Sequence, residues 1–465
     1  MSVSTEAREL GLSILGLGTR YPPYTLDSRA VEELSKRYHP ETPAMQKVLA
    51  INRFTGIDKR SSIGRPDHWL VNQPEPPTIA QLHDVFMSDG VPLAISASKE
   101  ALAEAHINDV SQITHMVSAT CTDSANPGYD HYVAKALGLS PFVEKTLLHG
   151  VGCSGGLAAL RTAANLCLGH STRGLPARIL VVTLEISTTL VRSELESIHS
   201  NQETRIGVCL FSDCASAVVV SNDIPFSPTE PLPPPVYSLL DWRHQTVPDT
   251  EQDLGFDTHP QGWKVVLSPR VPNLTASVLE PTYNSLMSGK KLPEGYGSPK
   301  DFDWAMHPGG ATILTGAEKV LGIQPEHMRA SYDTYVNHGN SSSATIFSVL
   351  NRLRGKEMDG VAPGGRGARE LVVGCAFGPG ITVEMCLLRR NLSRTEGGRK
   401  GMETPPETEE SSEDGEGGRE VSEEEKKGSE VSEEEKKGSE VSEEEKKGSE
   451  EEAFIAKALE SVELD

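Results

Sequence analysis

An almost unbroken apolar, β-branched run at residues 177–186, ARILVVTLEI, restricts the possible folds of this chain more than any other feature. A strand with this composition presents apolar side chains on both faces, so both faces must be covered by other elements. A second run of the same kind, CASAVVVS, follows at residues 214–221. Strands buried on both faces are typical of α/β proteins, in which helices cover the two sides of a sheet.

Further strand and helix patterns alternate with these two runs through the first 390 residues. Within residues 92–107, the apolar positions Ile95, Ala101, Leu102 and Ala105 have helical spacing. The other predicted elements are a strand opening residues 12–23, a strand in 113–122 that ends at Cys121, helices in 154–169, 272–288 and 338–353, and two strands around a Gly-Pro turn in 369–388. This alternation predicts an α/β protein, and the proline-rich residues 225–237 mark a connector or a domain boundary.

The C-terminal segment differs in kind from the rest of the chain. The decapeptide VSEEEKKGSE occurs three times in succession, starting at Val421, Val431 and Val441. Residues 391–465 hold 26 acidic and 11 basic residues, a net charge of −15 out of −22 for the whole chain. We expect this segment to be a disordered acidic tail, because each repeat offers a single valine to bury. The remaining −7 on residues 1–390 gives no basic stripe for a nucleic acid.

The cysteines and the N-terminus indicate a reduced, cytoplasmic protein. The seven cysteines form no CxxC pair, and MSVSTEARELG lacks the apolar core of a signal peptide. The longest apolar runs are too short to span a bilayer, so no membrane span is expected. No Cys/His spacing fits a zinc site, and we expect no metal.

Cys153 is the first candidate for chemistry, in the stretch LHGVGCSGGLAALR at residues 147–160. It precedes a predicted helix, whose N-terminal N–H groups and dipole favour a thiolate. Gly152, Gly155 and Gly156 permit a tight turn and close approach of a substrate. The structural alternative is a small apolar residue at a tight turn, which is common for cysteine.

Two polar residues further along the chain can partner a nucleophilic cysteine. His307 lies in WAMHPGGA after a strand-like approach, and Asn340 lies in NHGNSSSAT just before a predicted helix. His338 is a weaker candidate than either. A lone histidine is more often a packed or surface group, and an asparagine before a helix is usually a cap. The set of three at glycine-flanked junctions is more informative than each residue alone, because sites in α/β proteins gather at strand ends.

Two chemistries fit a cysteine, a histidine and an asparagine in this order. In papain-like hydrolases the asparagine orients the histidine. In thioester-condensing enzymes the histidine and asparagine both point at a thioester oxygen and stabilise an enolate. The stretch GVGCSGG lies in mid-chain and lacks the papain-type signature, which favours the condensing chemistry.

Four motifs in the same order carry a resemblance to a known family: GVGCSGG, WAMHPGG, GNSSSAT and AFGPG. Together they resemble the type III polyketide synthases of the chalcone and stilbene synthase superfamily, over residues 10 to 390. The stretch GLGTRYPPY is most similar to the fungal branch, whose members make alkylpyrones, alkylresorcinols and alkylresorcylic acids from fatty acyl starters. The resemblance implies a homodimeric thiolase-like fold with αβαβα layers, made of two similar halves at residues 1–225 and 226–390.

The resemblance also implies an acyltransferase reaction. Cys153 takes a starter acyl group from CoA, and His307 keeps the thiolate ion-paired. His307 and Asn340 then hold the thioester oxygen of malonyl-CoA during decarboxylation, and the enolate attacks the acyl group on Cys153. Repeated extension ends in cyclisation, with CoA thioesters as substrates and no cofactor.

Pocket residues follow from the same resemblance. Two gating phenylalanines of the family fall on Phe211 and on Val265, and the loss of a ring at Val265 favours a long aliphatic starter. Other positions that shape the substrate pocket fall on Ser187, Leu190, Phe256, Ser342, Phe377, Gly378 and Pro379. Ala376 replaces the first glycine of the usual Gly-Phe-Gly-Pro-Gly loop, which should narrow the pocket slightly. The residues expected to bind the CoA phosphates are Lys47, Arg53 and Lys59, for which ordinary surface charge is the alternative.

Three other functions stay open at this point. A ketoacyl synthase III-like enzyme performs a single condensation, with an acyl carrier protein as a partner. A cysteine thioesterase or hydrolase releases free acid. A non-catalytic scaffold would use the acidic tail to recruit a basic partner.

Overall fold

The computed structural model describes residues 10–259 and 262–394, so the prediction of a disordered tail lies outside the described residues. Nine strands form one mixed sheet in the order β11-β12-β13-β8-β1-β7-β6-β4-β5. The strands are β1 (Ser13–Arg20), β4 (His115–Ala119), β5 (Glu144–Leu148), β6 (Arg178–Ile186), β7 (Asp213–Ser221), β8 (Tyr237–Thr246), β11 (Asp303–Met306), β12 (Leu371–Gly378) and β13 (Thr382–Arg390).

The sheet has two halves that meet at a short junction between β1 and β8. These two strands pair antiparallel over only two residue pairs, Ser13 with Ser238 and Ile14 with Tyr237. Strands β1, β7, β6, β4 and β5 form one half, and β8, β13, β12 and β11 form the other. The connector 225–237 runs between β7 and β8, and therefore from one half to the other.

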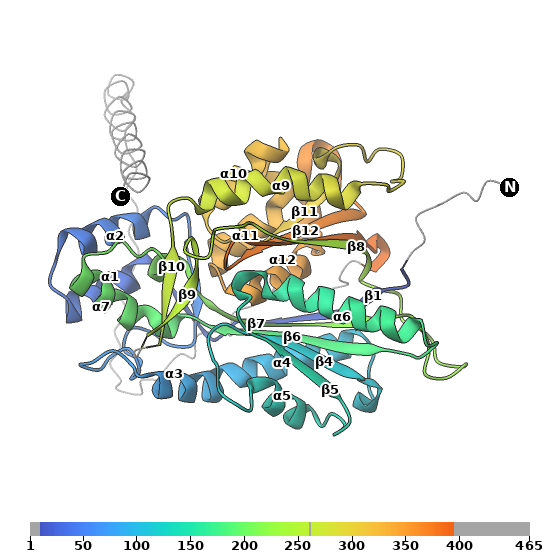
Figure 1. Cartoon of the computed structure of the whole chain (residues 1–465), viewed down its shortest axis with the longest axis horizontal. Helices are drawn as coiled ribbons and strands as arrows, with labels where there is room; N and C mark the ends of the chain where they lie inside the picture. Colours follow the sequence, from blue (N-terminus) through green and yellow to red (C-terminus); the bar gives the residue numbers. More distant parts are fainter. Residues whose placement is uncertain (1–9, 260–261, 395–465) are drawn as a thin grey trace, which may run out of the picture. The chain divides into compact units, whose positions relative to one another are not determined.

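Helices complete a five-layer arrangement around the two halves (Figure 1). Helices α6 (Gly155–Ser171) and α12 (Thr345–Leu353) lie between them and contact strands of both. Helices α4 (Val91–Glu104) and α5 (Tyr129–Leu137) cover the outer face of one half. Helices α9 (Val271–Met287) and α10 (Ala311–Leu321) cover the outer face of the other. The predicted αβαβα order is confirmed.

Strand β6 explains why this order forms. All nine of its residues are buried. Ile179 and Val181 belong to the apolar cluster around α6 and α12, whereas Leu180, Val182 and Leu184 belong to the cluster around α4. Side chains alternate between the faces of a strand, so the continuous apolar run supplies two layers of core at once. Each fully buried aliphatic side chain contributes about 1.5–3 kcal/mol.

The glycines of β1 determine how closely α4 approaches the sheet. A Cβ atom on Gly16 would lie 2.2 Å from the carbonyl oxygen of Ala101, and one on Gly18 would lie 2.0 Å from that of Ala97. Such distances are shorter than any real contact, so the helix backbone lies directly on the strand. The sequence GLG in the first strand is thus a requirement of helix–sheet packing.

Helices α1, α2 and α7 lie beside the β9–β10 hairpin at one end of the fold (Figure 1). The sequence analysis did not predict the hairpin. These elements and the others not yet named are α1 (Ser28–Tyr38), α2 (Pro43–Arg53), α3 (Ile79–Val85), α7 (Val191–Asn201), α8 (Gly207–Leu210), α11 (Arg329–His338), α13 (Lys356–Gly360), β2 (Tyr24–Leu26), β3 (Arg60–Ser62), β9 (Leu254–His259) and β10 (Gly262–Leu267). Within the described residues, no helix combines the length and the apolar character needed to cross a bilayer.

Candidate active site

Cys153 lies in a 3-10 turn, Gly152–Ser154, that leads directly into α6. Gly152 has a φ of +45°, and a Cβ atom there would lie 2.6 Å from the ring of Pro379. A Cβ on Gly156 would lie 2.5 Å from the carbonyl oxygen of Ser343. The glycines around Cys153 therefore allow the turn to pack against two other segments, one after β12 and one before α12.

His307 follows β11 immediately, and its backbone N–H donates to the carbonyl of Cys375 at 2.8 Å. The residue is 1% exposed, and neither ring nitrogen has a hydrogen-bond partner among the described residues. Burial lowers the pKa of His307 to about 3, which favours the neutral imidazole. A buried, unpartnered imidazole of this kind is available to accept a proton or to donate to a substrate oxygen.

Hydrogen bonds of both the backbone and the side chain hold Asn340 in position. Its N–H donates to the carbonyl of Leu210 at 3.0 Å, and its own carbonyl accepts from Ser212 at 2.9 Å. The side-chain Nδ2 donates to the carbonyl of Gly309 at 3.1 Å, and Oδ1 accepts from the N–H of Ser342 at 2.8 Å. The amide is therefore held beside the loop that begins at His307, in one defined orientation.

Cys153 interacts with Asn340 and with Ser342. Burial raises the pKa of the Cys153 thiol to about 11, while hydrogen bonds with the side chains of Ser342 and Asn340 act in the opposite direction. Asn340 thus contacts the thiol and also the loop after His307. Asn340 and His307 are buried and Cys153 is half-buried, and Asn340 connects the other two candidates, which come from separate segments.

His338, the weaker candidate, has a different environment. Its ring stacks on that of Tyr21 with centroids 3.7 Å apart, and its Nδ1 lies 3.0 Å from the hydroxyl of Ser61. Burial lowers the pKa of His338 to about 4. These contacts describe a packed histidine whose polar atom already has a partner.

The sequence analysis missed a buried carboxylate next to the site. Glu185, near the end of β6, accepts from the N–H of Cys121 at 3.0 Å and from the hydroxyl of Thr122 at 3.0 Å. It also accepts from the hydroxyl of Ser343, and burial raises its pKa. The thiol of Cys121 lies 3.3 Å from the hydroxyl of Ser342. The detectable signal was an acidic residue at the end of an otherwise apolar strand.

A small, largely apolar cavity of about 30 Å³ lies beside Phe211. We call it the acyl cavity. Four predicted pocket residues line it: Phe211, Val265, Ser187 and Leu190. Phe256 packs edge-on against Phe211 at a centroid distance of 6.0 Å and pairs with Val265 in the β9–β10 hairpin. The predicted pocket residues of this group therefore come together.

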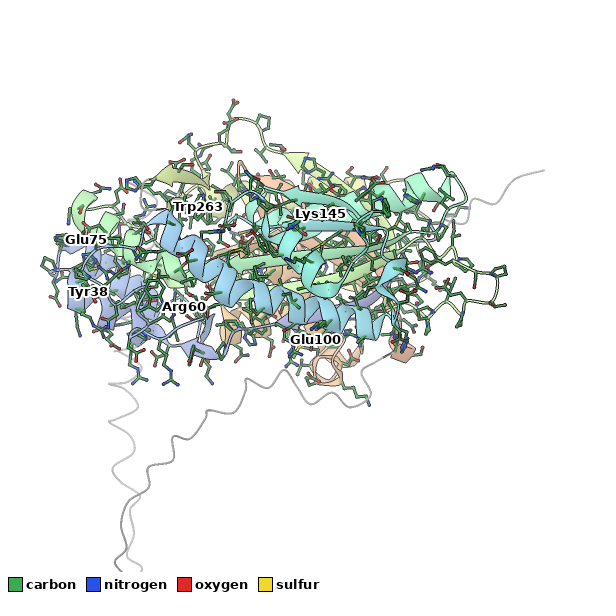
Figure 2. All side chains as sticks on the ribbon, turned by 90° about the horizontal axis from the view of Figure 1, so that it is seen from below. Tyr38, Arg60, Glu75, Glu100, Lys145 and Trp263 are labelled. Atoms are coloured by element: carbon green, nitrogen blue, oxygen red, sulfur yellow. The ribbon has the colours of Figure 1, made fainter. Side chains whose placement is uncertain are left out.

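The acyl cavity is tightly closed near Phe211. A Cβ atom on Gly207 would lie 3.2 Å from both the Phe211 ring and the Val265 methyl groups. Arg60, which the sequence analysis did not single out, also lines the cavity and donates to the carbonyl of Val208 at 2.5 Å. Figure 2 shows Arg60 at the same end of the molecule as Tyr38 and Trp263, away from Lys145.

The other predicted substrate and CoA residues lie elsewhere. Phe377 is buried in the apolar cluster of α9 and α10, and a Cβ on Gly378 would lie 2.3 Å from the hydroxyl of Ser154. Gly378 and Pro379 pack against the Cys153 turn, and none of the three residues lines the acyl cavity. The CoA candidates are a half-buried Lys47 on α2, an exposed Arg53 that pairs with Glu32 at 3.0 Å, and an exposed Lys59 before β3.

Metal ligands do not gather in this site. Across residues 10–259 and 262–394, no group of three or more His, Cys, Asp or Glu side chains is placed to hold a metal ion.

Two family models match most of the folded part of the chain. The N-terminal domain of chalcone and stilbene synthases matches residues 14–224, and the C-terminal domain of the same enzymes matches residues 239–391. Both matches lie within the segment that the four motifs had indicated.

Relatives and solved structures agree with these matches. The chain is 40% identical to the type III polyketide synthase pspB of Penicillium soppii, over 82% of this chain and 96% of that protein. It is 36% identical to the acylalkylpyrone synthase csyB of Aspergillus oryzae, over 82% and 94%. The crystal structure of a type III pentaketide synthase from Neurospora crassa is 69% identical, with a TM-score of 0.80 over 82% of this chain and 100% of that one.

Proposed function

Since this chain belongs to the chalcone and stilbene synthase family and is a type III polyketide synthase, we propose that its starter is a long-chain fatty acyl-CoA. Malonyl-CoA is the extender, and the products are alkylpyrones, alkylresorcinols or alkylresorcylic acids. The acyl cavity carries this proposal, because it is lined mainly by aliphatic side chains beside Phe211. The similarity to an acylalkylpyrone synthase and to a pentaketide synthase supports it.

The proposed reaction begins with Cys153. Its sulfur attacks the thioester carbonyl of the starter, the thiol proton passes to His307, and CoA leaves as a free thiol after taking up that proton. Malonyl-CoA then loses CO₂, and the resulting enolate oxygen is held by Asn340 Nδ2 and His307. The enolate carbon attacks the acyl group on Cys153, the C–S bond breaks, and the extended chain leaves on CoA with the sulfur free again.

The free energy gained by burying methylene groups favours the binding of a long acyl starter. Each methylene group moved from water into an apolar cavity contributes about 0.8 kcal/mol. Eight further methylenes would therefore favour binding by roughly 6 kcal/mol before the costs of ordering the chain. Val265 lines the acyl cavity where the resemblance expects a phenylalanine, and its smaller side chain fills less of the cavity than a ring would.

The proposed function is tested by incubating the protein with acyl-CoA starters of graded length and isotope-labelled malonyl-CoA, followed by mass spectrometry. We expect labelled pyrone or resorcinol products that contain several extender units. A single added two-carbon unit would instead identify a ketoacyl synthase III-like enzyme. Free fatty acid without label would identify a thioesterase.

We predict that Val265→Phe will shift the preferred starter to shorter chains. A phenyl ring at this position would fill space next to Phe211 and Gly207, where atoms already lie 3.2 Å from a Cβ built on Gly207. The matched control is Val266→Phe, one residue further along β10, because Val266 is not among the residues lining the acyl cavity. An unchanged product profile in Val265→Phe would show that this residue does not limit the starter.

The enzyme is further proposed to act as a homodimer. Strand β5 ends the sheet and, among the described residues, pairs only with β4. Phe142, two residues before β5, is 90% exposed. An exposed strand edge beside an exposed aromatic ring is a feature that proteins usually cover. Pairing of two copies around a two-fold axis would cover both.

Substrates and location complete the proposal. CoA thioesters are the substrates, no further cofactor takes part, and Lys47, Arg53 and Lys59 bind the CoA phosphates. All seven cysteines are free, which is compatible with a reducing cytoplasm.

A further inference from the structure

A second cavity adjoins the acyl cavity. It has a volume of about 30 Å³ and is lined by residues between 62 and 71. Four residues line both cavities: Leu26, Leu34, Thr188 and Val191. We call these four residues the partition, because each of them separates one cavity from the other. An acyl chain longer than the acyl cavity would have to pass the partition to continue into the second cavity.

Asp213 holds one side of the partition in place. Its Oδ1 accepts from the backbone N–H of Ser187 at 2.7 Å and from that of Thr188 at 2.8 Å. Its Oδ2 accepts from the hydroxyl of Thr188 at 2.5 Å and from the N–H of Ile63 at 2.9 Å. The hydroxyl of Thr188 also accepts from that of Ser62 at 3.1 Å. One carboxylate therefore fixes both the backbone and the side chain of Thr188.

The groups bound by Asp213 are themselves cavity walls. Ser187 lines the acyl cavity, Ile63 lines the second cavity, and Thr188 lines both. Asp213 begins β7, two residues after Phe211, and is fully buried. A buried carboxylate that accepts four hydrogen bonds restricts its donors strongly, because moving any donor leaves a polar group unpaired. The partition is thus held more rigidly than aliphatic contacts alone would hold it.

We propose that Asp213 is a positioning residue that keeps the partition closed and thereby sets the longest acyl chain that the enzyme accepts. This inference rests on the proposed function, since it assumes an acyl starter in the acyl cavity. Asp213 does not touch the reacting atoms in this scheme. It acts through Thr188. The position of Thr188 determines whether the distal end of the acyl chain ends at the partition or extends into the second cavity.

Two variants weaken this anchor to different degrees. Asp213→Asn keeps the shape of the side chain but replaces an acceptor by an NH₂ group, which faces other donors. Thr188→Val keeps the branched shape and removes only the hydroxyl that donates to Asp213. The matched control is Thr188→Ser, which keeps the hydroxyl. A second control is Asp303→Asn. Asp303 is a fully buried carboxylate on β11 that accepts from Arg329, and neither residue lines the acyl cavity or the second cavity.

The measurement is kcat and KM for acyl-CoA starters of graded length, normalised to folded protein by thermal denaturation. For starters just beyond the wild-type limit, we expect KM to fall and kcat/KM to rise about tenfold in Asp213→Asn, relative to short starters, with a smaller rise in Thr188→Val. Short starters should keep their wild-type kcat in Asp213→Asn, because they do not reach the partition and Asp213 does not line either cavity. Thr188→Ser and Asp303→Asn should keep the wild-type length profile, whatever their stability.

The outcomes separate this inference from the proposed function. Equal losses of kcat/KM for all starters in Asp213→Asn and Thr188→Val would overturn the inference and leave Asp213 with a structural role. If Asp213→Asn does not fold, the pair Thr188→Val and Thr188→Ser decides the question alone. If the wild-type protein extends no acyl-CoA at all, the proposed function fails before the variants are compared.

Discussion

Cys153→Ala should abolish both acyl loading and product formation. The thiol is the group on which the starter is held in the proposed reaction, and alanine provides no atom that can form the thioester. We expect the rate of product formation to fall by a factor on the order of 10⁴ or more, as is usual when the nucleophile of a covalent mechanism is removed. Loading is measured by intact-protein mass spectrometry after incubation with acyl-CoA.

Decarboxylation of malonyl-CoA should respond differently. His307 and Asn340 remain in Cys153→Ala, and they are the residues proposed to hold the enolate oxygen. Release of labelled CO₂ from malonyl-CoA should therefore persist at a measurable rate without chain extension. If Cys153→Ala released no labelled CO₂ while keeping the wild-type melting temperature, the thiol would also take part in decarboxylation.

Cys167→Ala is the matched control for this prediction. Cys167 lies on the same helix, α6, and is fully buried in its apolar core, where burial raises the pKa of its thiol to about 12. We expect this variant to load the acyl group normally. Acyl loading of Cys153→Ala at the wild-type level would place the covalent intermediate on another residue and would remove Cys153 from the mechanism.

The layers of the fold could be predicted because their signals are local. The continuous apolar run of β6 demands cover on both faces, and the structure places two separate apolar clusters there. The motif around Cys153 predicted a tight turn before a helix, which the structure shows as a 3-10 turn before α6. In contrast, the β9–β10 hairpin has mixed exposure and a weak pattern, so it was missed.

The walls of the acyl cavity could not be derived from local patterns. Ser187, Phe211 and Val265 come from three separate elements, and only the resemblance to a family suggested that they meet. Asp213 lies two residues after Phe211, in the stretch CLFSDC at residues 209–214, but its donors lie at Ile63 and Thr188, far from it in the sequence. A carboxylate at the start of an apolar strand signals that partners exist, and the packed structure is needed to identify them.

The chemistry of the site depends on a competition between burial and hydrogen bonding. Burial raises the pKa of Cys153 to about 11 and lowers the pKa of His307 to about 3, so each group taken alone prefers its neutral form. A reactive thiolate therefore requires help from its neighbours. Ser342, Asn340 and the N-terminus of α6 supply part of this help, and a proton accepted by His307 would supply the rest.

His307→Gln tests this account through the pH dependence of Cys153. Without the imidazole, only the two hydrogen bonds and the N-terminus of α6 oppose burial, so the pKa of the thiol should stay raised. Each pH unit below the pKa reduces the thiolate about tenfold. We therefore expect alkylation of Cys153 by iodoacetamide at pH 7 to slow by about 100-fold, with a rate that rises steadily up to pH 10.

Asn340→Ala distinguishes the proton acceptor from the oxyanion contact. This variant keeps His307, so its alkylation profile should move to higher pH by much less than that of His307→Gln. Asn340→Ala should slow malonyl-CoA decarboxylation by about 10²–10³-fold, because it removes one proposed donor to the enolate oxygen. His307→Gln should slow it less, because the glutamine amide can still donate. If His307→Gln left the alkylation profile of Cys153 at its wild-type position, the imidazole would not share the thiol proton, and activation of the nucleophile would have to come from the helix terminus and the two hydrogen bonds alone.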